Sequence, residues 1–124
     1  MFTVKVEQSR NALSIAYGGD VTPDETRLCA EQVRLALAIL EPGYRLLVDL
    51  TGLNAMDLSC SPIIANIMEM CNAAGVADVV RIIPDPTRDI GLQILSFFHY
   101  GKGVSIRTCA SVAEANDLLA QRAA

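Results

Sequence analysis

The chain has 124 residues, of which 52% are hydrophobic and 19% are charged, and its formal net charge is −4. This length suits one folded domain over residues 1–124, and this hydrophobic content excludes intrinsic disorder, which requires few apolar residues. The 10 basic residues form no cluster of the kind that binds nucleic acid, and no apolar stretch reaches the roughly 18 residues of a membrane span.

The first part of the chain predicts a β-hairpin followed by a helix. Residues 2–8 and 12–19 alternate apolar and polar side chains, as half-buried strands do, and polar turn residues separate them. A capping box, Thr22-x-x-Glu25, then begins a helix with Pro23 at its first position. Apolar residues recur along this helix at helical spacing, namely Leu28, Val33, Leu35, Ala36, Ile39 and Leu40, and Pro42-Gly43 ends it.

The rest of the chain alternates strands and helices. A continuous apolar run in residues 44–50 predicts a strand covered on both faces. The later elements are a helix over 62–74, a strand over 76–83, a helix over 85–101, a strand over 104–109 and a helix over 111–121, which begins with a second capping box, Ser111-x-x-Glu114. Because strands that alternate with helices pair mainly in parallel, the order β-β-α-β-α-β-α-β-α predicts an α/β fold. We expect a mostly parallel five-stranded sheet with one antiparallel strand, flanked by helices.

The reactive residue types are few. The four cysteines, at positions 29, 60, 71 and 109, contain no C-x-x-C pair, and His99 is the single histidine, so no metal site is predicted. Reduced cysteines that serve in packing are typical of a cytoplasmic protein. No glycine-rich nucleotide-binding motif is present, and we expect no cofactor.

Three segments in this order resemble the STAS domain, the module of sulfate transporters and bacterial anti-sigma factor antagonists. They are AYGGDVTPDETRLCAEQVRLAL (16–37), RLLVDLTGLNAMDLS (45–59) and GVADVVRIIPDPTRDIGLQIL (75–95). The resemblance covers nearly the whole chain. It implies a STAS-like fold and a regulatory role through protein contacts in the bacterial cytoplasm, with an anti-sigma-type kinase as a partner.

Residues Asp57, Leu58, Ser59, Cys60 and Ser61 form the turn after the third predicted strand. Sites in open α/β sheets gather at such carboxyl ends, so this turn is the predicted binding and regulatory loop. In antagonist members of the family, a partner kinase phosphorylates the serine directly after the loop aspartate. The resemblance aligns Asp57 with that aspartate, Leu58 with the phosphorylated serine, Ser59 with a second hydroxyl position and Cys60 with a glycine. Because Leu58 has no hydroxyl, the usual switch is missing, and Ser59 is the candidate for phosphorylation.

Three of the loop residues also have a structural interpretation. An aspartate at the position of Asp57 commonly accepts hydrogen bonds from turn N–H groups, which is the interpretation we favour. Ser61 before Pro62 is expected to be the N-cap of the next helix. Cys60 is expected to pack, since no base is close to it in sequence.

A surface for a protein partner is predicted next to this loop. Ile64 and Met68 follow it on the helix over 62–74, and Leu92 and Leu95 lie off the core stripe of the helix over 85–101. An exposed apolar strip of this kind would suit a partner or a second copy of the chain, although single exposed apolar residues are also normal.

The function that these observations favour is a non-enzymatic protein-interaction module. The alternative is a domain that binds a small apolar or anionic ligand, since Met68, Met70 and two phenylalanines would suit an apolar guest. An enzyme ranks last, because Asp57, Ser59, Cys60 and the distant His99 are its only catalytic materials, and catalysis needs a nucleophile beside a base or a paired acid and base.

Overall fold

The computed structural model describes residues 1–83, 100 and 103–120. The predicted helix over 85–101 therefore lies outside the described residues, except for Tyr100. In chain order the elements are β1 (Phe2–Glu7), the 3₁₀ turn η1 (Gln8–Arg10), β2 (Ala12–Val21), α1 (Pro23–Leu37), β3 (Arg45–Met56), the 3₁₀ turn η2 (Leu58–Cys60), α2 (Ser61–Ala73), β4 (Asp78–Ile82), β5 (Ser105–Cys109) and α4 (Val112–Ala120).

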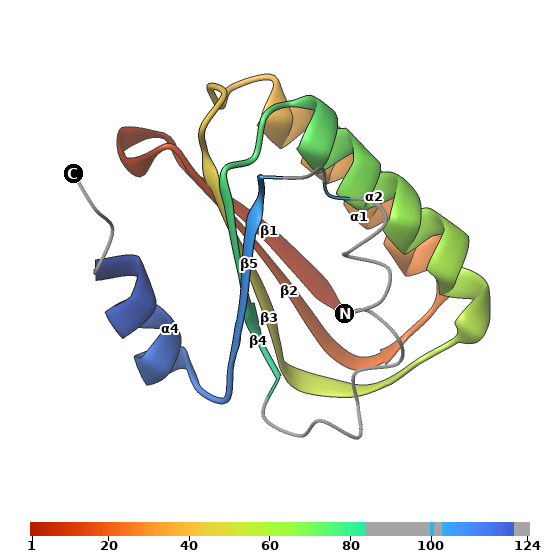
Figure 1. The fold of residues 1–124 in the computed structure, drawn as a ribbon. Helices are drawn as coiled ribbons and strands as arrows, with labels where there is room; N and C mark the ends of the chain where they lie inside the picture. The colour runs from red at the N-terminus through yellow and green to blue at the C-terminus, as the bar shows by residue number, and fades with distance from the viewer. Residues whose placement is uncertain (84–99, 101–102, 121–124) are drawn as a thin grey trace.

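The strands form one mixed sheet in the order β1-β2-β3-β4-β5. β1 pairs antiparallel with β2, and every other neighbouring pair is parallel. Helices α1 and α2 cover one face of this sheet and α4 covers the other (Figure 1). The predicted α/β architecture with one antiparallel strand is confirmed.

The core has two parts, one on each face of the sheet. The larger lies between the sheet and helices α1 and α2, and it includes the fully buried Leu13, Tyr44 and Leu46. The Tyr44 hydroxyl donates a 2.6 Å hydrogen bond to the carbonyl oxygen of Cys71 in α2, which satisfies its polar atom inside the core. The smaller part lies under α4 and joins Val80, Ile82, Cys109 and Ala115 to Leu47, Leu118 and Leu119. Strand β3 therefore contacts apolar side chains on both faces, as its continuous apolar run predicts.

Strand β3 is longer than its sequence predicts. It continues beyond residue 50 to Met56, because residues of the polar segment after Leu50 still pair with β2, as Gly18 opposite Gly52 and Gly19 opposite Leu53 show. The register between the two strands shifts twice in this stretch. The extension carries the chain past the carboxyl end of β4 before the chain turns into η2.

Helix α1 has two apolar faces, of which the core uses one. Its buried residues are the small or β-branched Thr26, Cys29, Val33 and Ala36. The expected stripe is therefore divided, since Leu28, Leu35 and Ile39 remain 61%, 56% and 51% exposed. Small buried side chains allow the helix to approach the sheet closely, and the larger leucines then face solvent.

Two further observations limit the kinds of site that the described part of the chain contains. None of its helices is long and apolar enough to span a membrane. Within the same residues, no group of three or more His, Cys, Asp and Glu side chains is placed to hold a metal ion.

Candidate functional site

The predicted loop lies where two strands end and two helices begin. β2 ends at Val21 and β3 ends at Met56, and the two run parallel, so both carboxyl ends reach the same edge of the sheet. Helix α1 starts two residues after the first strand end, and η2 leads into α2 after the second. The Asp57 backbone N–H donates to the Val21 carbonyl oxygen at 3.4 Å and ties the two turns together.

Asp57 caps the turn that contains the loop. One of its carboxylate oxygens accepts a 2.8 Å hydrogen bond from the backbone N–H of Ser59 and a 2.6 Å hydrogen bond from the Ser59 hydroxyl. These two bonds, the hydroxyl bond first, lower the pKa of the Asp57 carboxyl below its usual range. The favoured interpretation of Asp57 as a turn aspartate is confirmed.

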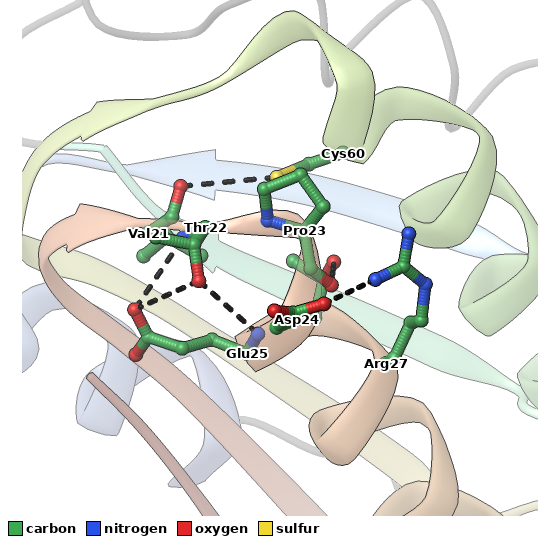
Figure 2. A network of polar contacts seen from close by, with 8 residues as sticks. Val21, Thr22, Pro23, Asp24, Glu25, Arg27 and Cys60 are labelled. Atoms are coloured by element: carbon green, nitrogen blue, oxygen red, sulfur yellow. Dashed lines mark hydrogen bonds and ion pairs between the residues drawn. The ribbon is translucent and has the colours of Figure 1, made fainter.

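Leu58 and Cys60 point in opposite directions from η2. Leu58 is 75% exposed, whereas Cys60 is fully buried. The Cys60 thiol donates to the carbonyl oxygen of Val21 at 3.8 Å, so it holds the turn against the end of β2 (Figure 2). Cys60 is therefore a packing residue, as expected, and the same anchor leaves Leu58 directed into solvent.

The expectation for Ser61 is wrong. The helix already includes Ser61, whose backbone is helical with φ −53° and ψ −45°, and the residue in the cap position is Cys60, whose side chain makes no capping hydrogen bond. The reason is the short 3₁₀ turn before α2, which supplies the first helical residues earlier than the Ser-Pro sequence suggests. The Ser61 N–H donates to the Leu58 carbonyl as part of this turn.

The neighbouring turn after β2 contains the predicted capping box (Figure 2). The Glu25 N–H donates to the Thr22 hydroxyl oxygen at 3.3 Å, and the Thr22 N–H donates to the Glu25 carboxylate at 3.4 Å. Sequence reasoning did not assign this turn to the site, because β2 was considered only as half of a hairpin. Its parallel pairing with β3 is the signal that would have placed Val21 and Asp57 at one edge.

The site has few means to catalyse a reaction. The base closest to the Ser59 hydroxyl is Asp57, and a carboxylate with a lowered pKa is a weak base near neutral pH. Burial raises the pKa of the thiols of Cys29, Cys71 and Cys109, to about 11 for Cys71, which keeps them protonated. His99 lies outside the described residues.

The structure corrects part of the predicted partner surface. Ile64 and Met68 are buried, because α2 turns its apolar stripe toward the core and leaves no face of these two side chains for a partner. Leu92 and Leu95 lie outside the described residues. Within the predicted loop, the structure exposes the apolar side chain of Leu58.

Two cavities lined by the described residues bear on the ligand-binding alternative, and neither is an empty apolar pocket of ligand size. The apolar cavity that Met68 lines has a volume of about 30 Å³, room for about one water molecule. A larger groove of about 730 Å³ lies between η1 and α4, far along the strands from the loop. Its two arginines already have acidic partners, since Arg45 binds Asp78 at 2.9 Å and Arg10 lies 3.7 Å from Glu7.

The sequence matches no protein-family model and no curated protein. Among solved structures, an uncharacterized protein of the DUF3478 family from Shewanella loihica, described as having a SpoIIAA-like fold, superimposes with a TM-score of 0.72 at 18% identity, over 95% of this chain and 93% of that chain. The unphosphorylated form of the anti-sigma factor antagonist SpoIIAA superimposes with a TM-score of 0.67 at 17% identity, over 98% and 100%. An anti-sigma factor antagonist from Mycobacterium paratuberculosis gives 0.61 at 16% identity, over 98% and 96%.

These structures agree with the resemblance of the three sequence segments. The likeness extends over almost the full length of this chain and of each of the three structures. At identities below 20% it concerns the fold. The chain therefore has the fold of a STAS-like domain, the fold of the anti-sigma factor antagonist SpoIIAA.

Proposed function

We propose that this chain, as one domain over residues 1–124, is a regulatory protein-interaction module of the anti-sigma factor antagonist type. It acts in the bacterial cytoplasm without catalysis, and it contacts a protein partner through the turn of residues 57–61. The shared fold supports this class of function. The Ser59 hydroxyl donates to the Asp57 carboxylate, whose lowered pKa makes it a weak base, and this suits a structural role of the pair in the turn.

The observation that carries the proposal is the exposure of Leu58. The side-chain hydrogen bonds of the turn join Asp57 and Ser59, and its buried anchor is Cys60, so the Leu58 side chain serves neither purpose. Burying an exposed leucine side chain against a partner is favourable by about 1.5–3 kcal/mol. A large apolar side chain that is exposed on a hydrogen-bonded turn is therefore suited to be a contact residue.

The same residue removes the usual means of regulation. Bacillus SpoIIAA has been solved in a phosphorylated form, and the resemblance puts the phosphorylated serine of the family at the position of Leu58. Ser59 is the substitute that we propose, because it is exposed and lies one residue further along the turn. A phosphate on Ser59 would replace the hydroxyl donor with negative charge next to the Asp57 carboxylate and would weaken the turn by repulsion.

The test is capture of partners from the native host with three versions of the chain. Leu58→Asp places a charge at the proposed contact. Val112→Asp is the matched control, because Val112 is also an exposed apolar residue, 46% exposed at the start of α4 on the other face of the sheet. We expect an anti-sigma-type kinase to bind the wild type and Val112→Asp equally, and its recovery with Leu58→Asp to fall at least about tenfold, the factor that 1.4 kcal/mol produces.

Equal recovery of that kinase with Leu58→Asp would reject the turn as the contact surface. Failure to recover any regulatory protein with the wild type would reject the proposed class of function. Mass spectrometry of the chain after incubation with the captured kinase then tests the switch. Phosphate on Ser59 supports the substitution, and an unmodified Ser59 rejects it while leaving the contact surface in place.

A further inference from the structure

We infer that this chain forms a symmetric dimer, in which β1 pairs antiparallel with β1 of a second copy and α1 packs against its counterpart. This surface is distinct from the turn of residues 57–61. Two separate features of the structure, an open strand edge and an exposed apolar helix flank, lie next to each other and fit the same two-fold axis. The inference does not depend on the proposed function.

The first feature is the open edge of β1. β1 is the outermost strand of the sheet, and within residues 1–83, 100 and 103–120 no strand pairs with its outer side. Met1 and Gly18 exchange both backbone hydrogen bonds, at 2.7 and 2.9 Å, so Thr3, Lys5 and Glu7 also direct their backbone groups toward β2. Phe2, Val4 and Val6 consequently direct their N–H and C=O groups to the open edge.

These outward groups are complementary to themselves. If a two-fold axis passes beside Val4, then Val4 lies opposite Val4 of the second copy and Phe2 lies opposite Val6, and all three residues find backbone partners. The same register places Lys5 opposite Thr3 of the second copy. Because like charges directly opposite each other destabilise a strand pair, this register avoids the repulsion that an axis beside Lys5 would cause.

The second feature is the stripe of Leu28, Leu35 and Ile39. At about 100° per residue, Leu28 and Leu35 lie within about 20° of each other and about 100–120° from Cys29, and Ile39 follows two residues after the end of the helix. The Cys29 sulfur lies 3.5 Å from the Tyr17 hydroxyl on β2, so Cys29 marks the face of α1 that points to the sheet. The stripe therefore occupies a flank of the helix, and its three members are more than half exposed.

The flank that carries the stripe is the one next to β1. The amino nitrogen of Met1 forms an ion pair with Glu25 in the first turn of α1. Beyond the other end of β1, Asn11 accepts a 2.9 Å hydrogen bond from the backbone N–H of Glu41 after the end of the helix, and it donates one to the Glu41 carbonyl. Strand and helix thus run side by side in the same direction. Glu25, at about 60° from Leu28 around the helix, shows on which side β1 lies.

A single two-fold axis satisfies both features. Val4 lies about 10 Å along the strand from Met1, and the residue about 10 Å along α1 from Glu25 is Gln32. An axis beside Val4 therefore passes near Gln32 and brings Leu28 of each helix toward Leu35 of the other. Strands lie about 4.8 Å apart and packed helices about 8–10 Å apart, so two α1 helices above paired β1 strands are within reach of each other's leucines.

Sedimentation of the wild-type chain over a range of concentrations tests the dimer. The expected mass is twice the 13.3 kDa of one chain. Leu35→Glu should raise the dimer dissociation constant at least about tenfold, because it sets a carboxylate against an apolar side chain of the second copy. Val112→Glu is the matched control, an exposed apolar residue on the other face of the sheet, and it should leave the mass unchanged.

A wild-type chain that stays monomeric at every concentration would overturn the inference, and so would a Leu35→Glu chain that dimerises as well as the control. A cross-linking experiment tests the register separately. Under mild oxidation, a mixture of Thr3→Cys and Lys5→Cys chains should form a disulfide-linked dimer, while each variant alone should not. A dimer that gives no cross-link in the mixture would overturn the β1 pairing.

Discussion

The two turns at the carboxyl ends of β2 and β3 both connect a strand to a helix, but they expose different kinds of side chain. Each follows a strand, β2 or β3, and leads into a helix, α1 or α2. In the first turn, residues 22–25, Thr22 and Glu25 exchange hydrogen bonds, the exposed Asp24 pairs with Arg27 of the helix, and none of the four residues exposes a large apolar side chain. The second turn is also held by its own hydrogen bonds, from Ser59 to Asp57, but it exposes Leu58. A capped turn therefore does not need an exposed leucine, and Leu58 is available for binding.

The largest expected effect is a difference in the free energy of unfolding between substitutions at Cys60 and Leu58 of the second turn. Cys60→Asp should lower the free energy of unfolding by about 3–5 kcal/mol, because it introduces a carboxylate at a fully buried position. Leu58→Asp should change it by less than about 0.5 kcal/mol, since the side chain stays in water. Urea unfolding of both variants measures the difference. A loss with Leu58→Asp as large as with Cys60→Asp would show that Leu58 stabilises the fold.

A smaller effect on stability is expected from substitutions at the N-terminal ends of α1 and α2. Thr22→Ala should cost about 1 kcal/mol, because it removes the hydroxyl that accepts the Glu25 N–H. Ser61→Ala should cause no loss, since the cap position of α2 carries no side-chain hydrogen bond, Ser61 is already helical, and alanine favours a helix slightly more than serine does. Thermal unfolding of the two variants provides the comparison. Equal losses would mean that Ser61 acts as a cap.

The smallest effect concerns the proton equilibrium of Asp57. Its pKa is lowered mainly by the hydrogen bond from the Ser59 hydroxyl, so Ser59→Ala should move the pKa back toward the usual value of an aspartate. Because the lowered pKa belongs to the folded state, the stability that Asp57 contributes is present above the usual pKa and is lost as the pH falls through the lowered one. A carboxyl titration by NMR measures the shift, with Ser61→Ala as the control. An unchanged Asp57 pKa in Ser59→Ala would contradict the hydrogen bond.

The order of elements was predictable from the sequence because most of its signals are local. The Thr22 capping box and the apolar run of residues 44–50 each depend on neighbours within a few residues, and both appear in the structure. Only half of the second predicted box forms, with the Glu114 N–H donating to the Ser111 hydroxyl at 3.1 Å. Its glutamate reaches back to the N–H of Ala110, one residue before the serine.

The surface was harder to predict, because exposure depends on tertiary contacts. The sequence does not indicate which apolar residues of α1 are buried. The contact between Cys29 and Tyr17 of β2 shows which face of the helix packs against the sheet. Ile64 and Met68 were expected at a partner surface but are buried, because the apolar stripe of α2 faces the core. From the sequence, Leu58 is notable because it lacks the hydroxyl of the family's phosphorylated serine. The structure indicates that its apolar side chain is exposed.

The central claim, that the turn of residues 57–61 is the contact surface, can be tested directly by NMR. The measurement is a titration of the isotope-labelled chain with the kinase captured from the native host. We expect the backbone amide signals of Asp57 to Cys60 to shift or broaden first, while the signals of α4 on the other face of the sheet remain unchanged. Changes confined to α4 or to another surface, with residues 57–60 unaffected at saturation, would contradict the account.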